Sequence, residues 1–298
     1  MVYHIPALLD ESIKGLNIRP EGIYADVTFG GGGHSMEILK HLTTGKLIAF
    51  DQDEDAAVNI PDNTNFIFLD QNFRFLRNNL VFNGITSIDG LIADLGVSFH
   101  QFDEPARGFT FRHDASLDMR MNKKSTLTAA ELIRTVDEPL LADILYNFGE
   151  LPNSRKIARE IVTARKISPI LSAGDLLDVI GKFTPSRQEH KFYAKVFQAL
   201  RIAVNQEIEY LKEMLLQALE MLNRGGRLVV ITYHSLEDRV VKNFMRTGNF
   251  DGIERKDFYG NPETPFKVLT KKGITPGPEE IASNNRARSA RLRIAEKV

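Results

Sequence analysis

The stretch that decides the fold is residues 22–42, which read GIYADVTF, then GGGG, then HSMEILKHL. The apolar segment 22–29 predicts a buried strand, and the segment 35–42 predicts a helix. Glycine lets the backbone approach a ligand closely and adopt positive φ. A strand, a glycine-rich turn and a helix in this order form the nucleotide-binding corner of doubly wound sheets. A tight turn without a ligand would use the same residues, so this stretch alone leaves both interpretations open.

Strands and helices alternate along the rest of the first hundred residues. Further strands are predicted at 46–51, 65–70 and 88–95, with short helices at 53–59 and 72–82 between them. Such alternation indicates parallel pairing and an α/β sheet. Strand character returns at 227–233, after the glycine pair 225–226, and two more strands are predicted at 266–270 and 290–295.

The intervening region shows helical patterns only. Helices are predicted at 126–147, 154–166, 172–182 and 188–204, followed by a long helix at 207–222. The predicted organisation is therefore one α/β domain interrupted by a helical insertion. Residues 1–104 and 206–298 form the two parts of the α/β core, and residues 105–205 form the inserted helical subdomain.

Composition excludes several classes of protein. The chain has 298 residues and no cysteine, which excludes disulfide scaffolds, cysteine-ligated zinc, iron–sulfur clusters and thiol nucleophiles. No run of about 18 apolar residues exists, so no transmembrane helix is expected. The first residues lack the basic start of a signal peptide. We expect a cytoplasmic protein without membrane contact.

Charge is distributed unevenly although the net charge is only −1. Residues 1–104 hold 6 basic and 15 acidic side chains, whereas residues 105–298 hold 32 basic and 24 acidic ones. This asymmetry indicates a polyanionic partner for the later part, although surface charge can also vary by chance. The candidate RNA contacts are Arg155, Lys156, Arg159, Arg165, Lys166, Lys182, Arg187, Lys191, Lys195, Arg201, Arg286, Arg288, Arg291 and Arg293.

Acidic residues end several of the predicted strands. Asp51 ends the second strand, 18 residues after Gly33, where a carboxylate can accept hydrogen bonds from ribose hydroxyls. NAD enzymes and S-adenosylmethionine enzymes share this feature. The fingerprint G-x-G-x-x-G is absent, and Asp26 lies in the first strand, where methyltransferases often have an acid. These details favour a methyltransferase, and a P-loop is excluded because no Gly-Lys-Ser/Thr follows the glycines.

Two further residues are candidates by position. Phe73, just after the third strand, could stack on an adenine, or it could be a core aromatic. Asp94 ends the fourth strand, where reacting groups lie in open α/β sheets, but it could also cap a helix or lie in a solvated loop.

Motifs spread over nearly the whole chain identify a family resemblance. They are HIPALL (4–9), DVTFG (26–30), GGHS (32–35), DLGVS (94–98), RGF (107–109), LDMRM (117–121), FQALRI (197–202), HSLEDR (234–239) and NRARS (285–289). The chain resembles the RsmH (MraW) family of bacterial 16S ribosomal RNA cytosine-N4 methyltransferases. The resemblance implies a Rossmann-like class I methyltransferase fold with an inserted helical subdomain, S-adenosylmethionine as cofactor and no metal. It assigns residues 1–104 and 206–298 to the cofactor-binding core and residues 105–205 to substrate or RNA binding.

The resemblance also implies a site and a substrate. The cofactor-binding residues that it implies are Gly32, Gly33, His34, Asp51, Phe73, Asp94 and Gln101. The implied substrate is a cytidine in the decoding region of 16S ribosomal RNA, methylated on its exocyclic nitrogen, so the small ribosomal subunit is the expected partner. The chain departs from the family at residues 99–100 (Phe-His for Ser-Pro), at 232–233 (Thr-Tyr for Ser-Phe) and at Asn122, where an acid is common.

Asp94 and His234 are the candidate catalytic residues. Asp94 could accept a hydrogen bond from the cytosine amine, and His234, after the fifth strand, could accept the released proton or contact RNA. A structural histidine is the alternative for His234, and Arg120 is a further candidate phosphate contact. Three other functions stay open on the residues alone: a NAD-dependent oxidoreductase, a non-enzymatic RNA-binding assembly factor and a small-molecule methyltransferase.

Overall fold

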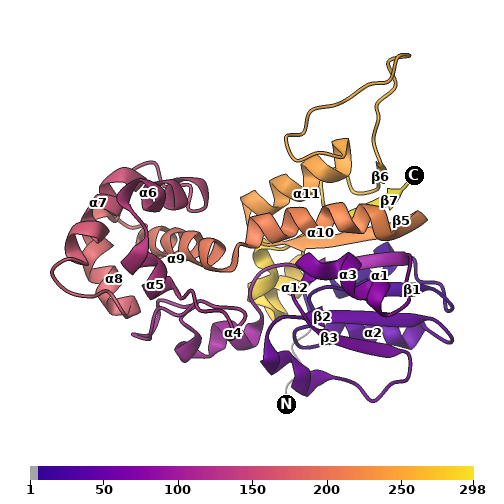
Figure 1. Ribbon diagram of the computed structural model, residues 1–298, viewed down its shortest axis with the longest axis horizontal. Coiled ribbons are helices and arrows are strands. Elements are labelled where there is room, and N and C mark those ends of the chain that lie inside the picture. The colour runs from indigo at the N-terminus through magenta and orange to yellow at the C-terminus, as the bar shows by residue number, and fades with distance from the viewer. Residues whose placement is uncertain (1–5) are drawn as a thin grey trace. The chain divides into compact units, whose positions relative to one another are not determined.

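The computed structural model describes residues 6–298, so the first two residues of the motif at 4–9 lie outside the described residues. Its centre is a seven-stranded sheet in the order β3-β2-β1-β4-β5-β7-β6 (Figure 1). The strands are β1 (Ile23–Asp26), β2 (Lys46–Asp51), β3 (Phe66–Asp70), β4 (Ile88–Asp94), β5 (Leu222–Thr232), β6 (Phe266–Val268) and β7 (Arg291–Lys297). The first five run parallel, and β7 pairs antiparallel with both β5 and β6.

Both faces of this sheet are covered by helices. The helices are α1 (Leu9–Leu16), α2 (Gly33–His41), α3 (Leu76–Phe82), α10 (Glu207–Met221), α11 (Ser235–Thr247) and α12 (Pro278–Ser283). Neighbouring strand residues alternate between two cores. Leu91 and Ala93 pack with α3, α10 and α11, whereas Ile92 packs with α1 and α2. A strand buried on both faces needs a continuous apolar sequence, which the central strands have.

The chain divides into two compact units, one containing residues up to Gly96 and Ile208–Val298, the other containing Val97–Glu207. The helices of the second unit are α4 (Phe99–Asp103), α5 (Ala129–Thr135), α6 (Glu138–Asn147), α7 (Ser154–Ala164), α8 (Ala173–Ile180) and α9 (Glu189–Asn205). This unit has its own apolar core, which includes Leu141, Ile157, Leu176 and Leu200. No helix of the described residues is long and apolar enough to span a membrane.

The predicted fold class is confirmed: the chain forms an α/β sheet, with a run of helices between β4 and β5. One predicted helix is wrong in extent. The stretch 126–147 forms two helices, because the extended residue Asp137 separates them and its carboxylate accepts a hydrogen bond from Leu140 N (2.9 Å) at the start of α6. The predicted assignment of residues 1–104 and 206–298 to cofactor binding, and of 105–205 to RNA binding, remains a prediction.

Five other elements differ from the sequence-based expectation: β5 and four helices. Strand β5 begins at Leu222, five residues earlier than predicted, so that the glycine pair lies within it. The pairing of β4 with β5 shifts there from Ile88–Leu222 to Gly90–Arg227, and Gly225 has a φ of 80°, so the glycines form an irregularity within the strand. Helices α1, α4, α11 and α12 were not predicted from the sequence.

Candidate cofactor-binding site

The glycine turn lies between β1 and α2. Gly30 and Gly32 have positive φ values of 49° and 78°, a conformation that glycine adopts without steric cost. Gly32 N donates to Phe29 O at 2.7 Å, and Gly32 is also the residue that precedes α2. A Cβ atom added at Gly31 would meet no atom of the chain within 4 Å, so the backbone faces open space there.

Asp51, at the end of β2, holds this turn in place. Its Oδ2 accepts a hydrogen bond from Gly30 N (2.7 Å), and its Oδ1 accepts one from Asp53 N (2.8 Å). Burial raises the pKa of Asp51 to about 6, although these two hydrogen bonds act in the opposite direction. Each oxygen keeps a further lone pair, so the carboxylate can still accept hydrogen bonds from a ligand.

Asp26 connects β1 to its neighbours. Its Oδ2 accepts a hydrogen bond from the Ser35 hydroxyl (2.7 Å) in α2, and its Oδ1 accepts one from Thr28 N (3.0 Å). The Thr28 hydroxyl in turn accepts a hydrogen bond from Asp94 N (2.6 Å) at the end of β4. Burial raises the pKa of Asp26, although the hydrogen bonds from Ser35 and Thr28 act in the opposite direction.

Asp94 is the third carboxylate at the carboxyl edge of the sheet, where β1, β2 and β4 end in Asp26, Asp51 and Asp94. Its Oδ1 accepts a hydrogen bond from the Tyr233 hydroxyl (2.9 Å), and its Oδ2 lies 3.9 Å from His34 Nδ1. Burial raises the pKa of Asp94 to about 7, and the negative charges of Asp26 and Glu237 add to this effect. The hydrogen bond from Tyr233 acts in the opposite direction.

Tyr233 is the residue of this edge that sequence analysis did not select as a site residue. It was noted only as a departure from the family pattern at the end of the predicted fifth strand. Its place after β5 was the available signal, because β4 and β5 pair in parallel and their carboxyl ends lie together.

His34, predicted to bind the cofactor, is buried at the start of α2. Burial lowers its pKa to about 4, so the imidazole is neutral at pH 7 and the 3.9 Å approach to Asp94 is not an ion pair. Its Nε2 has no hydrogen-bond partner within the described part of the chain. A buried ring nitrogen without a partner is costly unless a ligand or water satisfies it.

Phe73, Gln101 and His234 have structural contacts of their own. Phe73 lies in a short 3₁₀ helix and packs at the margin of the core under α3. Gln101 lies in the second unit, where its Oε1 accepts a hydrogen bond from Ser98 N (3.1 Å) in a capping box at the start of α4. His234 precedes α11; its Nδ1 accepts a hydrogen bond from Glu237 N (3.4 Å), and its Nε2 lies 3.1 Å from Glu237 Oε1. The roles predicted for these three side chains remain predictions.

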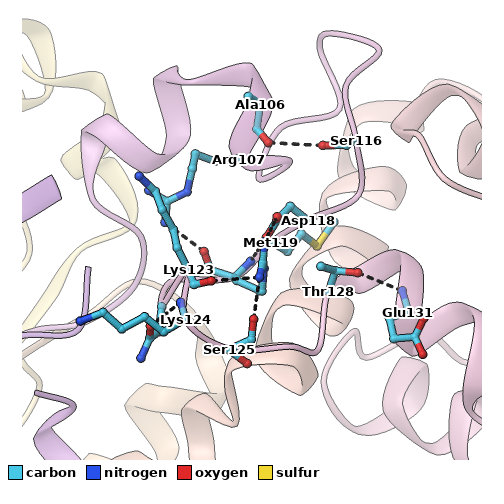
Figure 2. Close-up of polar contacts among 12 residues, drawn as sticks. Ala106, Arg107, Ser116, Asp118, Met119, Lys123, Lys124, Ser125, Thr128 and Glu131 are labelled. Carbon is cyan, nitrogen blue, oxygen red and sulfur yellow. Dashed lines mark hydrogen bonds and ion pairs between the residues drawn. The ribbon is translucent and has the colours of Figure 1, made fainter. Parts of the chain in front are cut away.

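The motif at 117–121 forms polar contacts that organise the following turn of the second unit (Figure 2). Arg120 forms a two-point ion pair with Asp118, with Nε–Oδ1 and Nη2–Oδ2 distances of 2.8 and 2.6 Å. Its Nη1 donates to the carbonyls of Lys123 (3.0 Å) and Ser125 (2.6 Å). The guanidinium thus organises the turn that follows it, which leaves little capacity for a phosphate group.

The sheet order, the glycine turn and the acids at the ends of β1, β2 and β4 define a Rossmann-like methyltransferase, the class of enzyme that takes its methyl group from S-adenosylmethionine. A family model described as the MraW methylase family matches residues 1–298. The chain belongs to the MraW methylase family.

Curated relatives agree with this membership. The chain is 56% identical over 297 residues to the ribosomal RNA small subunit methyltransferase H of Phocaeicola vulgatus, covering 99% of this chain and 98% of the relative. It is 53% identical to the protein of the same name from Cytophaga hutchinsonii, covering 99% and 100%. A more distant match is the solved structure of a putative methyltransferase from Streptococcus mutans in complex with SAH, at 14% identity, full coverage of both chains and a TM-score of 0.42.

The residues at this edge fit the cofactor of the class. Burial raises the pKa of both Asp51 and Asp94, and the negative charge of Asp26 adds to this effect. A ligand that carries a sulfonium and an ammonium group would relieve this repulsion. The open space at Gly31 and the partnerless Nε2 of His34 are also consistent with a bound ligand.

Proposed function

We propose that the protein methylates the exocyclic N4 amine of a cytidine in the decoding region of 16S ribosomal RNA. The observation that carries this proposal is the near-complete coverage by relatives named ribosomal RNA small subunit methyltransferase H. The acidic edge described above supports it, since it is suited to a cationic methyl donor. A ribosomal substrate would make the small subunit the partner and the cytoplasm the site of action.

Seven residues would hold S-adenosylmethionine: Gly32, Gly33, His34, Asp51, Phe73, Asp94 and Gln101. The cofactor supplies a methyl group that its sulfonium already activates. The open space beside Gly31, in the same turn, would leave room for it, and Asp51 would use its remaining lone pairs to accept hydrogen bonds from the ribose hydroxyls. Phe73 would provide an apolar face for the adenine. Asp94 would place a carboxylate near the positive charge of the methyl donor and near the positive charge that develops during the reaction.

The low nucleophilicity of the acceptor amine is the main obstacle to this reaction. Its lone pair is conjugated with the cytosine ring, so the amine is a poor nucleophile. A carboxylate that accepts an N–H hydrogen bond favours the pyramidal amine and stabilises the positive charge that develops on it. Asp94 Oδ2, which is not used by Tyr233, is the candidate for this contact. Alignment of the two substrates supplies much of the remaining rate.

His234 is the second catalytic candidate, as acceptor of the released proton. Because Nδ1 accepts a hydrogen bond from Glu237 N, the neutral ring carries its hydrogen on Nε2, which lies 3.1 Å from Glu237 Oε1. A released proton would therefore have to go to Nδ1 and displace that hydrogen bond. The same geometry suits a purely structural helix cap, because Nδ1 accepts from Glu237 N.

The proposed function is tested by transfer of a tritiated methyl group to small ribosomal subunits that lack the modification, followed by nucleoside analysis. We expect label in N4-methylcytidine, and labelling that is about 100-fold slower with Asp94→Asn. Label in another nucleoside would contradict the proposed position, and absence of transfer to any RNA would contradict the proposed substrate class.

A further inference from the structure

Tyr233, directly after β5, joins the carboxyl ends of two neighbouring strands through its side chain. Its hydroxyl donates to Asp94 Oδ1 at 2.9 Å, so the contact bridges β5 and the parallel strand β4. Burial raises the pKa of Tyr233 well above its ordinary value, and the charge of Asp94 adds to this effect. The phenol therefore keeps its proton at pH 7, and its single hydrogen is directed at the carboxylate.

The backbone holds both partners of this hydrogen bond. Tyr233 N donates to Glu237 Oε2 at 3.0 Å, which fixes the chain between β5 and α11. Asp94 N donates to the Thr28 hydroxyl at 2.6 Å, which ties the end of β4 to the chain after β1. A Cβ atom added at Gly96 would meet Tyr233 Cδ2 at 3.6 Å, so the ring lies beside the chain that follows β4. The hydroxyl and the carboxylate therefore meet in a defined geometry.

The two oxygens of Asp94 have different surroundings. Oδ1 accepts the hydrogen bond from Tyr233, whereas Oδ2 lies 3.9 Å from His34 Nδ1. That distance is too long for a hydrogen bond, so Oδ2 is the oxygen left for a ligand. A carboxylate with one oxygen anchored presents the other in one direction.

The titratable side chains near this pair come from four elements, β1, α2, α11 and α12: Asp26, His34, Glu237 and Glu280. The acids on β1 and α11 raise the pKa of Asp94, and those on α11 and α12 raise that of Tyr233. His34 is neutral at pH 7, because burial lowers its pKa to about 4. Within this group of side chains, the Tyr233 hydroxyl is the one that favours the ionised carboxylate.

We propose that Tyr233 is a positioning residue for methyl transfer: its hydroxyl holds Asp94 Oδ1, stabilises the negative charge of the carboxylate and leaves Oδ2 for the acceptor amine. This inference rests on the proposed function, because it takes Asp94 as the group that meets the amine. Tyr233 acts through Asp94 and needs no contact with the substrate. A hydrogen bond to an ionised acceptor is about twice as strong as one between neutral groups, so its loss should be measurable.

The pH profile of single-turnover methylation at saturating S-adenosylmethionine tests this role. Tyr233→Phe removes only the hydroxyl, so the neighbouring acids stay as they are. We expect the rising limb of the profile to move to higher pH by about 1–2 units, because a hydrogen bond to a charged acceptor is lost. On that limb the variant should be about 10- to 100-fold slower, and at high pH it should approach the unsubstituted rate. An unshifted profile, or an equal loss at every pH, would overturn the positioning role.

Tyr24→Phe is the matched control. Tyr24 in β1 is also buried, and its hydroxyl accepts a hydrogen bond from Arg19 N at 2.7 Å rather than contacting Asp94. Its loss should leave the pH profile in place. At a pH on the rising limb, the double variant Tyr233→Phe/Asp94→Asn should be no slower than Asp94→Asn alone, because Tyr233 acts through the carboxylate. Additive losses would give Tyr233 a substrate contact of its own and contradict the positioning role.

Urea unfolding supplies a readout that is independent of activity. At pH 8 the Tyr233 hydroxyl donates to an ionised carboxylate, whereas at pH 5 Asp94, with a pKa of about 7, is protonated. The unfolding midpoint of Tyr233→Phe should therefore fall further below that of the unsubstituted protein at pH 8 than at pH 5. An equal fall at both pH values would contradict the stabilised charge.

Nucleoside analysis of RNA labelled by the unsubstituted protein separates the two failures. Label in N4-methylcytidine together with an unshifted profile for Tyr233→Phe would overturn this inference alone. Absence of that label would overturn the proposed function, and the role of Tyr233 in it.

Discussion

The surroundings of Asp94 disfavour the ionised form of its carboxyl group. Its pKa of about 7 lies above the ordinary value of 3.8, so between these pH values the folded chain holds a proton that the unfolded chain releases. Stability therefore falls as pH rises through this window. We expect Asp94→Asn to raise the free energy of unfolding at pH 8 by roughly 1–4 kcal/mol, at about 1.4 kcal/mol per pKa unit. Urea unfolding should show a smaller gain at pH 5, and an equal gain at both pH values would contradict this origin.

The same substitution should impair the reaction. An asparagine puts an NH2 group in place of one carboxylate oxygen, so the side chain offers one acceptor fewer to the cytosine amine. Loss of one preorganised hydrogen bond typically costs about 100- to 1000-fold in rate, and we expect single-turnover methylation to fall by about 100-fold or more. RNA affinity should hardly change, since phosphate contacts dominate it. A rate within a few-fold of the unsubstituted protein would mean that another group accepts from the amine.

Asp51 combines a structural and a ligand-binding role. Asp51→Ala should weaken S-adenosylmethionine binding by roughly 10- to 100-fold, because hydrogen bonds to a charged acceptor contribute about 1.5–3 kcal/mol. It also removes the acceptor for Gly30 N and Asp53 N, so some loss of stability should accompany it. Asp51→Asn is the matched control, since it keeps one acceptor for the turn. Unchanged affinity by calorimetry in both variants would remove Asp51 from the site.

At the scale of elements, helix α11 separates the two interpretations of His234. Asparagine is among the best N-cap residues, so His234→Asn should preserve the start of α11 while removing the imidazole. A proton acceptor would show itself as a reduced single-turnover rate at unchanged melting temperature. An unreduced rate at unchanged melting temperature would mean that His234 acts only as the N-cap of α11. His234→Ala, which removes both functions, is the reference for loss of the cap.

Across the whole molecule, the seven-stranded sheet and the helical unit each have apolar cores of their own. The strand predictions at 46–51 and 88–95 were accurate because a strand buried on both faces has a short, continuous apolar sequence that glycine or polar residues end. The break at Asp137 and the early start of β5 could not be predicted as readily. The break at Asp137 depends on helix capping, and the start of β5 depends on its register against β4. The local pattern of apolar residues does not determine either.

The sequence by itself determined the α/β class, the glycine turn and the candidate acids Asp51 and Asp94, because apolar periodicity and glycine act locally. Only the tertiary structure decided what those acids experience. Tyr233 reaches Asp94 across 139 residues because β4 and β5 pair in parallel, and burial at that edge raises the pKa of Asp94. The exposure of Phe258 and Tyr259 was likewise decided in three dimensions, since an aromatic residue in a sequence is equally compatible with a core or a surface.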